Sequence, residues 1–228
     1  MTLYRRHVAE HGTWSADRLT EVTAADAAAV FEQDADGPAG ELMALFAESW
    51  RQLGTCLLAR YDGSFLGAVE AADGSAAALL GALAEMPHYA DVHHYGSLVV
   101  PLYKRAQITA SDLHQSLGGA GLGRFDDVDQ LTLFADNLVP HVLRMAGVLC
   151  HAPDLAGRIE RGELLVSGEP AEVELRACAV HAVELLVDGL ARRGVATTAA
   201  EVDHRLWRKG QAPEVKAVAR HRCRCVFY

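Results

Sequence analysis

The chain has 228 residues, half of them apolar, and carries a formal net charge of −9. This length suits one compact unit with a sizeable core, so we expect a single domain over residues 1–228. The acidic balance argues against a broad nucleic-acid-binding surface, which needs a net positive charge. No apolar run approaches the ~20 residues that span a bilayer, and the first residues contain no apolar signal core. We therefore expect a soluble protein that has neither nucleic acid nor membrane as a partner.

Cysteine usage indicates a reducing compartment. The five cysteines are an odd number without paired spacing: Cys56, Cys150, Cys178, Cys223 and Cys225. Such usage suits free thiols in the cytoplasm. The Cys223-Arg-Cys225 pair is a weak metal signal, with structural thiols as the alternative. His93-His94 lacks the i, i+4 spacing of a helical metal pair, so no metal is expected.

Three helices are predicted in the first half of the chain. Residues 40–59 carry large apolar residues at three- and four-residue steps, which is the period of one buried helical face. A shorter helix follows, with Ser75 as its N-cap and Pro87 as its stop. The segment 98–117 begins extended and continues as a helix to the glycine-rich break at 118–123.

Helical patterns also dominate the second half. Valines and leucines recur at helical steps from about 170 to 193, and Gly194 is the expected C-terminal cap. Residues 198–209 form one more predicted helix. The sequence contains no internal repeat and no series of strands able to build a sheet. The predicted fold class is therefore an all-α, single-domain helical bundle.

The stretch 125–144, FDDVDQLTLFADNLVPHVLR, places four aspartates among leucines and phenylalanines. A carboxylate in such surroundings caps a helix, pairs with a cation or does chemistry. Asp126 or Asp127 can cap a predicted helix that carries the apolar residues from Leu131 to Ala135. Pro140 then fits the first turn of the following helix.

Two carboxylates of this stretch, Asp129 and Asp136, lie seven residues apart. On one continuous helix they would share a face, roughly 10 Å apart, with room for a ligand between them. A capping Asp127 and a solvated Asp129 are the structural alternative. Asp136 has apolar residues on both sides, where water is scarce and a carboxylate needs a partner or a cationic ligand.

Two groups of cations stand out in this acidic chain. Lys104 and Arg105 lie at the start of a predicted helix, where the macrodipole disfavours positive charge. An anion held by the helix start and Lys104 would explain this placement, and a lysine whose stem covers apolar surface is the alternative. The terminal cluster of His221, Arg222 and Arg224 suits either a salt-bridge lock or a phosphate contact.

The EVELR run at the start of the long helix carries two further charge patterns. Glu172 and Arg176 are four residues apart, which predicts a stabilising surface pair. Glu174 and His181 share a second stripe, which favours a core histidine bonded to a carboxylate over catalysis.

Five short motifs follow one another along the chain. They are YKRAQI at 103–108, FDDV-Q-LT-FAD---P at 125–140, EVELRACAV at 172–180, LW at 206–207 and the ending HRCRCVFY. Together they resemble the queuosine salvage family, the queuosine 5′-phosphate N-glycosylase/hydrolases. The resemblance runs from about residue 40 to the last residue, in order and with similar spacings, so it is specific although each motif alone is weak.

The resemblance implies an all-helical fold like that of DNA glycosylases. It also implies hydrolysis of queuosine 5′-monophosphate to queuine and ribose 5-phosphate, with this nucleotide as the small-molecule partner and with no metal or other cofactor. By motif, Asp136 is the implied catalytic carboxylate, Asp127 is a second catalytic candidate and Lys104 is a substrate contact. The remaining substrate-binding candidates within or beside these motifs are Phe125, Asp129, Asn137, His141, Glu174, Arg176, His221 and Arg222.

The chain departs from the family pattern at three places. Residues 1–39 are divergent and lack an aromatic Asn-Phe-Ser-Phe-Trp segment common in the family, for which Tyr4 and Trp14 are the available substitutes. The residue after FAD, usually tyrosine, is Asn137, and the glutamine that often follows the proline is His141. These changes bear on base recognition more than on bond cleavage.

The implied chemistry agrees with the residue types. Cleavage of an N-glycosidic bond develops positive charge on the ribose, which a fixed carboxylate in a dry pocket stabilises while it orients the attacking water. A 7-deazapurine lacks the usual N7 protonation site, so help for the leaving group must come from elsewhere. The competing hypothesis is a non-catalytic carrier or sensor that binds queuine or a 7-deazapurine nucleotide.

Overall fold

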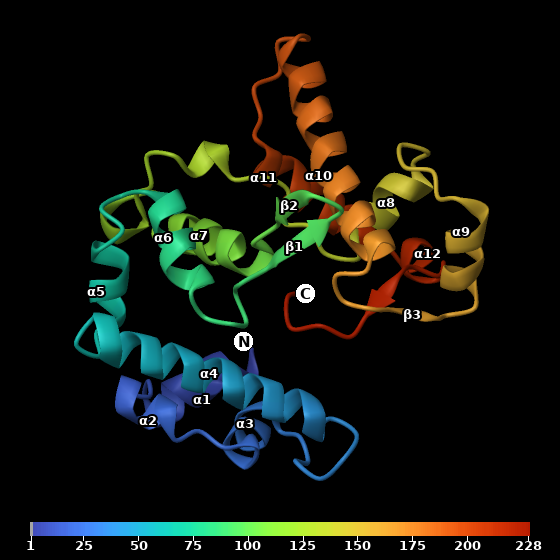
Figure 1. The fold of residues 1–228 in the computed structure, drawn as a ribbon. Coiled ribbons are helices and arrows are strands. Elements are labelled where there is room, and N and C mark those ends of the chain that lie inside the picture. Colours follow the sequence, from blue (N-terminus) through green and yellow to red (C-terminus); the bar gives the residue numbers. More distant parts are fainter. Residues whose placement is uncertain (1) are drawn as a thin grey trace. The chain divides into compact units, whose positions relative to one another are not determined.

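The computed structural model describes residues 2–228 and consists mainly of α-helices (Figure 1). The expected all-α class is confirmed, because the strands in this part of the chain form only two short pairs. By its internal contacts the chain divides into two compact units. One comprises the described chain up to Asp73 together with Met86–His88, and the other comprises Gly74–Glu85 and Tyr89–Tyr228. None of the described helices is long and apolar enough to cross a membrane.

The first unit is built around one long helix. Its helices are α1 (Leu3–His11), α2 (Ala16–Thr20), α3 (Ala24–Phe31), α4 (Gly40–Arg60) and α5 (Phe65–Glu70). The predicted helix at 40–59 is confirmed as α4, and it packs against α2 and α3. Gly54 permits the close approach of α2, because a Cβ atom there would lie 2.6 Å from the backbone oxygen of Ala16.

Aromatic rings of the first unit pack on one another. Trp14 meets Trp50 edge to face with ring centroids 5.2 Å apart, and the Tyr4 ring lies 6.2 Å from that of Trp50. Phe31 stacks on the same indole at 5.8 Å. The involvement of Tyr4 and Trp14 in base recognition stays a prediction.

The second unit begins with two helices and a hairpin. Its elements up to residue 130 are α6 (Ala76–Ala84), β1 (Val92–Tyr95), β2 (Leu98–Pro101), α7 (Lys104–Ser116) and the 3₁₀ turns η1 (Gly121–Gly123) and η2 (Val128–Gln130). β1 and β2 pair antiparallel, with Val92 opposite Pro101. The predicted Ser75 cap is confirmed, since its Oγ accepts a hydrogen bond from the Ala78 N–H at 3.1 Å.

The rest of the second unit includes the 22-residue helix α10. Its elements are α8 (Val139–Met145), α9 (Pro153–Glu160), β3 (Leu164–Leu165), α10 (Pro170–Ala191), α11 (Ala199–Gly210), α12 (Pro213–Lys216) and β4 (Arg222–Cys223), with β3 and β4 parallel. α8 and α11 pack against α10, and their apolar faces form one core. The predictions of a long helix at 170–193 and a further helix at 198–209 are confirmed. Gly194 follows α10 with a positive φ of 76°, as expected of a C-terminal cap.

The segment 131–136 is irregular, so the prediction of a helix there, capped by Asp126 or Asp127, is wrong. The segment runs through the core, and its apolar side chains are buried: Leu131, Leu133, Phe134 and Ala135. Because the chain bends between them, Asp129 and Asp136 do not share a helix face. The predicted position of Pro140 in the first turn of α8 is confirmed.

Side chains from three helices satisfy the backbone of this buried segment in place of a helical ladder. The bonds join Thr132 N to Gln107 Oε1 of α7 (2.8 Å), Phe134 N to Asp203 Oδ1 of α11 (3.3 Å), and Arg176 Nε of α10 to Ala135 O (3.0 Å). The fold therefore brings α7, α10 and α11 together around the residues that precede Asp136.

Candidate active site

Asp136 closes the buried segment just before α8. Its Oδ1 accepts hydrogen bonds from the backbone N–H groups of Leu138 (2.7 Å) and Val139 (3.0 Å). These bonds hold the carboxylate at the N-terminal end of the helix, where the macrodipole favours negative charge. Within residues 2–228, Oδ2 has no hydrogen-bond partner, and the side chain is half-buried. One oxygen is thus fixed, and the other is available to a ligand.

A second carboxyl group, Asp203 of α11, belongs to the same site. Its side chain is buried, and Oδ1 accepts the hydrogen bond from Phe134 N, two residues before Asp136. Burial, reinforced by the negative charge of Asp136, raises the pKa of Asp203 to about 7, against the lowering influence of the Phe134 N–H and of Lys104. The sequence carries a signal for this residue, because Asp203 shares the apolar helix face of Ala199 and Val202.

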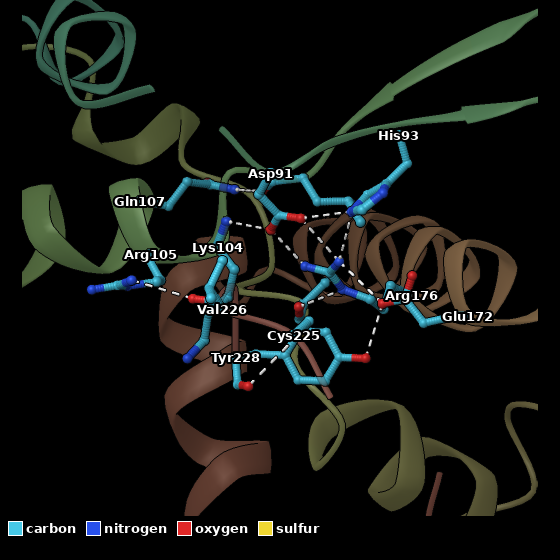
Figure 2. A network of polar contacts seen from close by, with 12 residues as sticks. Asp91, His93, Lys104, Arg105, Gln107, Glu172, Arg176, Cys225, Val226 and Tyr228 are labelled. Carbon is cyan, nitrogen blue, oxygen red and sulfur yellow. Dashed lines mark hydrogen bonds and ion pairs between the residues drawn. The ribbon is translucent and has the colours of Figure 1, made fainter. Parts of the chain in front are cut away.

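Lys104 is the first residue of α7, as predicted. The anion at this helix start is a carboxylate of the protein itself, because Asp91 Oδ2 accepts a hydrogen bond from the Lys104 backbone N–H at 3.1 Å. The Lys104 backbone N–H is therefore engaged within the protein, and an anionic ligand at this helix start stays a prediction. Figure 2 shows the Lys104 side chain pointing away from Asp91, beside the C-terminal segment. Its ammonium group remains available for a ligand.

A fully buried ion network lies behind this helix start (Figure 2). Arg176 Nη2 lies 2.6 Å from Asp91 Oδ2, and Nη1 lies 3.0 Å from Asp91 Oδ1 and 3.3 Å from Glu172 Oε1. The spacing of Glu172 and Arg176 does predict their pairing, but the prediction of a surface pair is wrong, since neither side chain is exposed. The reason is tertiary: Asp91, on a distant loop, neutralises the arginine inside the core.

The network keeps Asp91 ionised despite its burial. Burial would raise the pKa of Asp91, but hydrogen bonds from His93 and Arg176, and the charge of Arg176, outweigh it and hold that pKa below its usual value. The same partnership holds the pKa of Arg176 above its usual value against the effect of burial. The site therefore rests on a buried network in which Arg176 binds the carboxylates of Asp91 and Glu172.

The C-terminal segment covers this network. The Tyr228 hydroxyl donates to Glu172 Oε1 at 2.9 Å, and the Arg176 guanidinium lies 4.6 Å from the centroid of the Tyr228 ring. Arg105 Nη1 donates to the backbone oxygen of Val226 at 3.2 Å. The segment thus joins the start of α7 to α10, and Figure 2 shows it beside Lys104.

Comparison with known proteins places this chain in a family. A family model described as "Queuosine salvage protein" matches residues 2–228. The chain belongs to the queuosine salvage protein family. It is 41% identical over 214 residues to the queuosine 5′-phosphate N-glycosylase/hydrolase of Sphaerobacter thermophilus, covering 93% of this chain and 65% of that protein. It is also 35% identical to the protein of that name from Bos taurus (94% and 66% covered) and 34% identical to that from Mus musculus (87% and 62%). The chain thus spans just under two thirds of the length of these relatives.

Asp127, the second predicted catalytic carboxylate, caps a helix. Its Oδ1 accepts from Ala76 N at 2.6 Å, and its Oδ2 accepts from the Ser75 hydroxyl at 2.9 Å and from Ala77 N at 3.1 Å. Burial would raise the pKa of Asp127, but these backbone bonds hold it below its usual value. The contacts of Asp127 therefore support a capping role. The helix that it caps is α6, 50 residues earlier in the chain, and not the predicted helix that follows it.

Three predicted substrate contacts lie in the 125–144 segment. Phe125 is buried, Asn137 is half-buried beside Asp136, and Asp129 is exposed. Asp129 lines a surface hollow of about 490 Å³ between α7 and α11, together with His204 and Arg205. Asn137 is therefore the one of the three that lies next to the Asp136 carboxylate along the chain.

The other predicted contacts are engaged within the protein. His141 is buried and its Nε2–H donates to Val215 O at 3.0 Å, while Glu174 is exposed and accepts from the Tyr95 hydroxyl at 2.9 Å. The expected core histidine bonded to Glu174 is wrong, because His181 is exposed.

The terminal basic cluster does not form one cationic surface. His221 is 2% exposed, and burial lowers its pKa to about 3, so its ring is neutral. Arg222 is exposed and donates from Nη2 to the Gly162 backbone oxygen at 2.7 Å. Substrate binding by either residue stays a prediction. Of the cations predicted from the sequence, Lys104 is the one whose charge lowers the pKa of Asp203.

Proposed function

We propose that this protein hydrolyses the N-glycosidic bond of queuosine 5′-monophosphate and releases queuine and ribose 5-phosphate. The observation that carries the proposal is the geometry of Asp136, which has one oxygen fixed by two backbone N–H groups and the other unpartnered within residues 2–228. Family membership and the names of the relatives support the same activity.

Asp136 is the proposed catalytic carboxylate. As the bond from C1′ to the base nitrogen lengthens, positive charge grows on the ribose ring. A carboxylate that is already fixed stabilises this charge without reorganising, and its free oxygen can orient the attacking water. The apolar side chains on both sides of Asp136 strengthen the interaction, because they exclude water.

Lys104 is the proposed contact to the 5′-phosphate. The chain has a net charge of −9, so an anionic substrate needs a local cation. Because Asp91 already accepts the Lys104 backbone N–H, the ammonium group of Lys104 would make this contact. Asn137 is the candidate for base contact that lies next to Asp136 in the chain.

A non-catalytic queuine or 7-deazapurine nucleotide carrier is the alternative function. It would have no use for a fixed carboxylate at the reacting sugar, and the names of the relatives describe hydrolysis. The five cysteines are all free thiols, which fits the cytoplasm as the proposed location.

The decisive experiment incubates the purified protein with queuosine 5′-monophosphate and follows queuine and ribose 5-phosphate by mass spectrometry. We expect release by the parent protein and a loss of about 10²–10³-fold in kcat for Asp136→Asn. Asp126→Asn is the matched control, because it makes the same change at an exposed aspartate of the same segment. Nucleotide binding without release of queuine by the parent protein would instead establish the carrier.

A further inference from the structure

Asp203 is placed for chemistry by three different parts of the fold. Helix α11 packs against α8, α10, α12 and η2, and this packing buries the carboxyl group to 6% exposure. Phe134 N binds Oδ1, whereas Oδ2 has no hydrogen-bond partner within residues 2–228. Oδ2 is not sealed from solvent. The carboxyl group is therefore held by one oxygen and presents the other.

The charged groups that act on Asp203 are those of the proposed active site. They are Asp136, in the segment that leads into α8, and Lys104, at the start of α7. Ionisable groups elsewhere on the packed elements are engaged or exposed: Arg176 binds Asp91, His141 binds Val215 O, and Asp129 lies at the surface. Asp203 and Asp136 thus form a pair of carboxyl groups that share one environment but differ in burial.

We propose that Asp203 is the catalytic acid that protonates the departing base in the hydrolysis proposed above. The inference rests on that proposed function and assigns the proton donor that a 7-deazapurine leaving group requires. The two carboxyl groups divide the chemistry: Asp136 lies beside the sugar, and Asp203 carries the proton.

The step balances in atoms and charge. The C1′–N bond breaks, its electron pair goes to the base, and the Asp203 carboxyl group delivers a proton to the heterocycle, which leaves as neutral queuine. Water adds to C1′, and its surplus proton passes to the Asp136 carboxylate. Transfer of that proton back to Asp203 through solvent restores both groups, so one water is consumed per nucleotide cleaved.

Burial supports this division of roles. The pKa of Asp203 is raised to about 7, chiefly by burial and then by the charge of Asp136, so a large fraction of Asp203 carries its proton at neutral pH. A buried carboxyl group whose pKa is raised in this way is a recurrent source of the catalytic acid in enzymes.

A pH profile of kcat for queuine release tests the inference. For the parent protein we expect kcat to decline above about pH 7, as Asp203 loses its proton. Asp203→Asn should lower kcat by about 10²–10⁴-fold and abolish this decline, because no acid remains to titrate. Asp203→Glu should restore part of the rate together with a basic limb. Asp126→Asn, at an exposed aspartate of the 125–144 segment, is the matched control and should keep the parent profile.

A substrate with a good leaving group separates catalysis from structure. 4-Nitrophenyl ribofuranoside 5-phosphate releases a phenolate that needs little protonation. The factor by which Asp203→Asn lowers kcat should be at least about tenfold smaller on this substrate than on queuosine 5′-monophosphate. Asp136→Asn should lower kcat on both substrates. An equal loss on both substrates would overturn the role of Asp203 as an acid.

The remaining outcomes separate this inference from the proposed function. If the parent protein releases no queuine, the proposed function fails and the inference fails with it. If the parent protein is active but Asp203→Asn keeps both its rate and its basic limb, only the inference fails. Should Asp203→Asn not fold in a thermal unfolding assay, the parent and Asp203→Glu profiles decide, and a parent profile without a basic limb overturns the proposal.

Discussion

Arg176 and Asp91 form a bidentate ion pair in the core, with guanidinium–carboxylate N···O distances of 2.6 and 3.0 Å. The side chain of Arg176 is 0% exposed and that of Asp91 is 1% exposed. The pair joins α10 to the loop that caps α7, and Lys104 begins α7. The position of the proposed phosphate contact therefore depends on a charge interaction 85 residues apart in sequence.

Breaking this pair should destabilise the protein. Asp91→Asn removes the nearer of the two carboxylates that pair with the buried Arg176 and leaves only the 3.3 Å contact with Glu172. We expect a loss of about 3–5 kcal/mol in the free energy of unfolding, as is usual when one partner of a buried ion pair is removed. Urea unfolding measures this loss. Asp126→Asn is the control, since its ion pair with Arg124 is about 70% exposed, and exposed pairs contribute about 0–1 kcal/mol. Equal effects of the two changes would show that the core pair is not a stabilising element.

The Tyr228 hydroxyl should matter more than a similar hydroxyl at the surface. Tyr228→Phe leaves the buried Glu172 carboxylate without one donor, so we expect a loss of about 1–3 kcal/mol in the free energy of unfolding. Tyr95→Phe also removes a hydroxyl that donates to a glutamate, but Glu174 is exposed, and water replaces the bond. No measurable change is expected there. The prediction is wrong if both variants unfold at the same urea concentration.

Two helical glycines should respond in opposite directions to alanine. At Gly54 the new Cβ would meet Ala16 O at 2.6 Å, so Gly54→Ala should cost about 1–3 kcal/mol through overpacking. At Gly189 in α10 a Cβ meets nothing within 4 Å, so Gly189→Ala should stabilise by about 0.5–1 kcal/mol. Thermal unfolding of both variants checks this, and a stabilised Gly54→Ala would contradict the packing of α2 on α4.

Buried ionisable groups give two opposing pH dependences of stability. Burial lowers the pKa of His221 to about 3. Between about pH 6.5 and pH 3 the unfolded chain therefore binds a proton at this histidine that the folded protein does not bind. The free energy of unfolding falls as the pH falls through this range. The pKa of Asp203 is raised to about 7, so its contribution is complete below its unfolded pKa near 3.8 and is lost as pH rises towards 7.

Single variants should therefore change the pH dependence in opposite senses. Between about pH 4 and pH 6.5, His221→Phe should lose less stability on acidification than the parent protein, and Asp203→Asn should lose more. Urea unfolding at several pH values measures both slopes. A His221→Phe variant with the parent slope would mean that this histidine is accessible to protons in the folded state.

Lys104 should confer the preference for a phosphorylated substrate. Queuosine 5′-monophosphate should show at least about tenfold higher kcat/KM than queuosine, because binding energy from the phosphate is realised at the reacting sugar. Lys104→Ala should remove most of this preference and affect the nucleoside reaction far less. Lys216→Ala, at an exposed lysine of α12, should keep the preference. A Lys104→Ala variant that retains it would place the phosphate elsewhere.

The local patterns of the sequence predicted the helices well, because periodicity and capping residues act within one element. Residues 40–59 and 170–193 carry a clear apolar face, and Ser75 caps its own helix. The 131–136 segment was predicted wrongly for the same reason. Its apolar residues resemble a helix in sequence, yet distant side chains such as Gln107 satisfy its backbone, and no local pattern shows such a partner.

The sequence alone determined the family and pointed to Asp136, because ordered motifs and a carboxylate among apolar residues are properties of the chain itself. Only the tertiary structure decided what surrounds that carboxylate. Asp203, which belongs to the same site, lies 67 residues after Asp136 in the chain. Asp91, which pairs with the buried Arg176, lies 85 residues before that arginine. The pKa of Asp203 and the charge state of the core depend on burial and on neighbours through space, and these are set by packing between helices that are far apart in the chain.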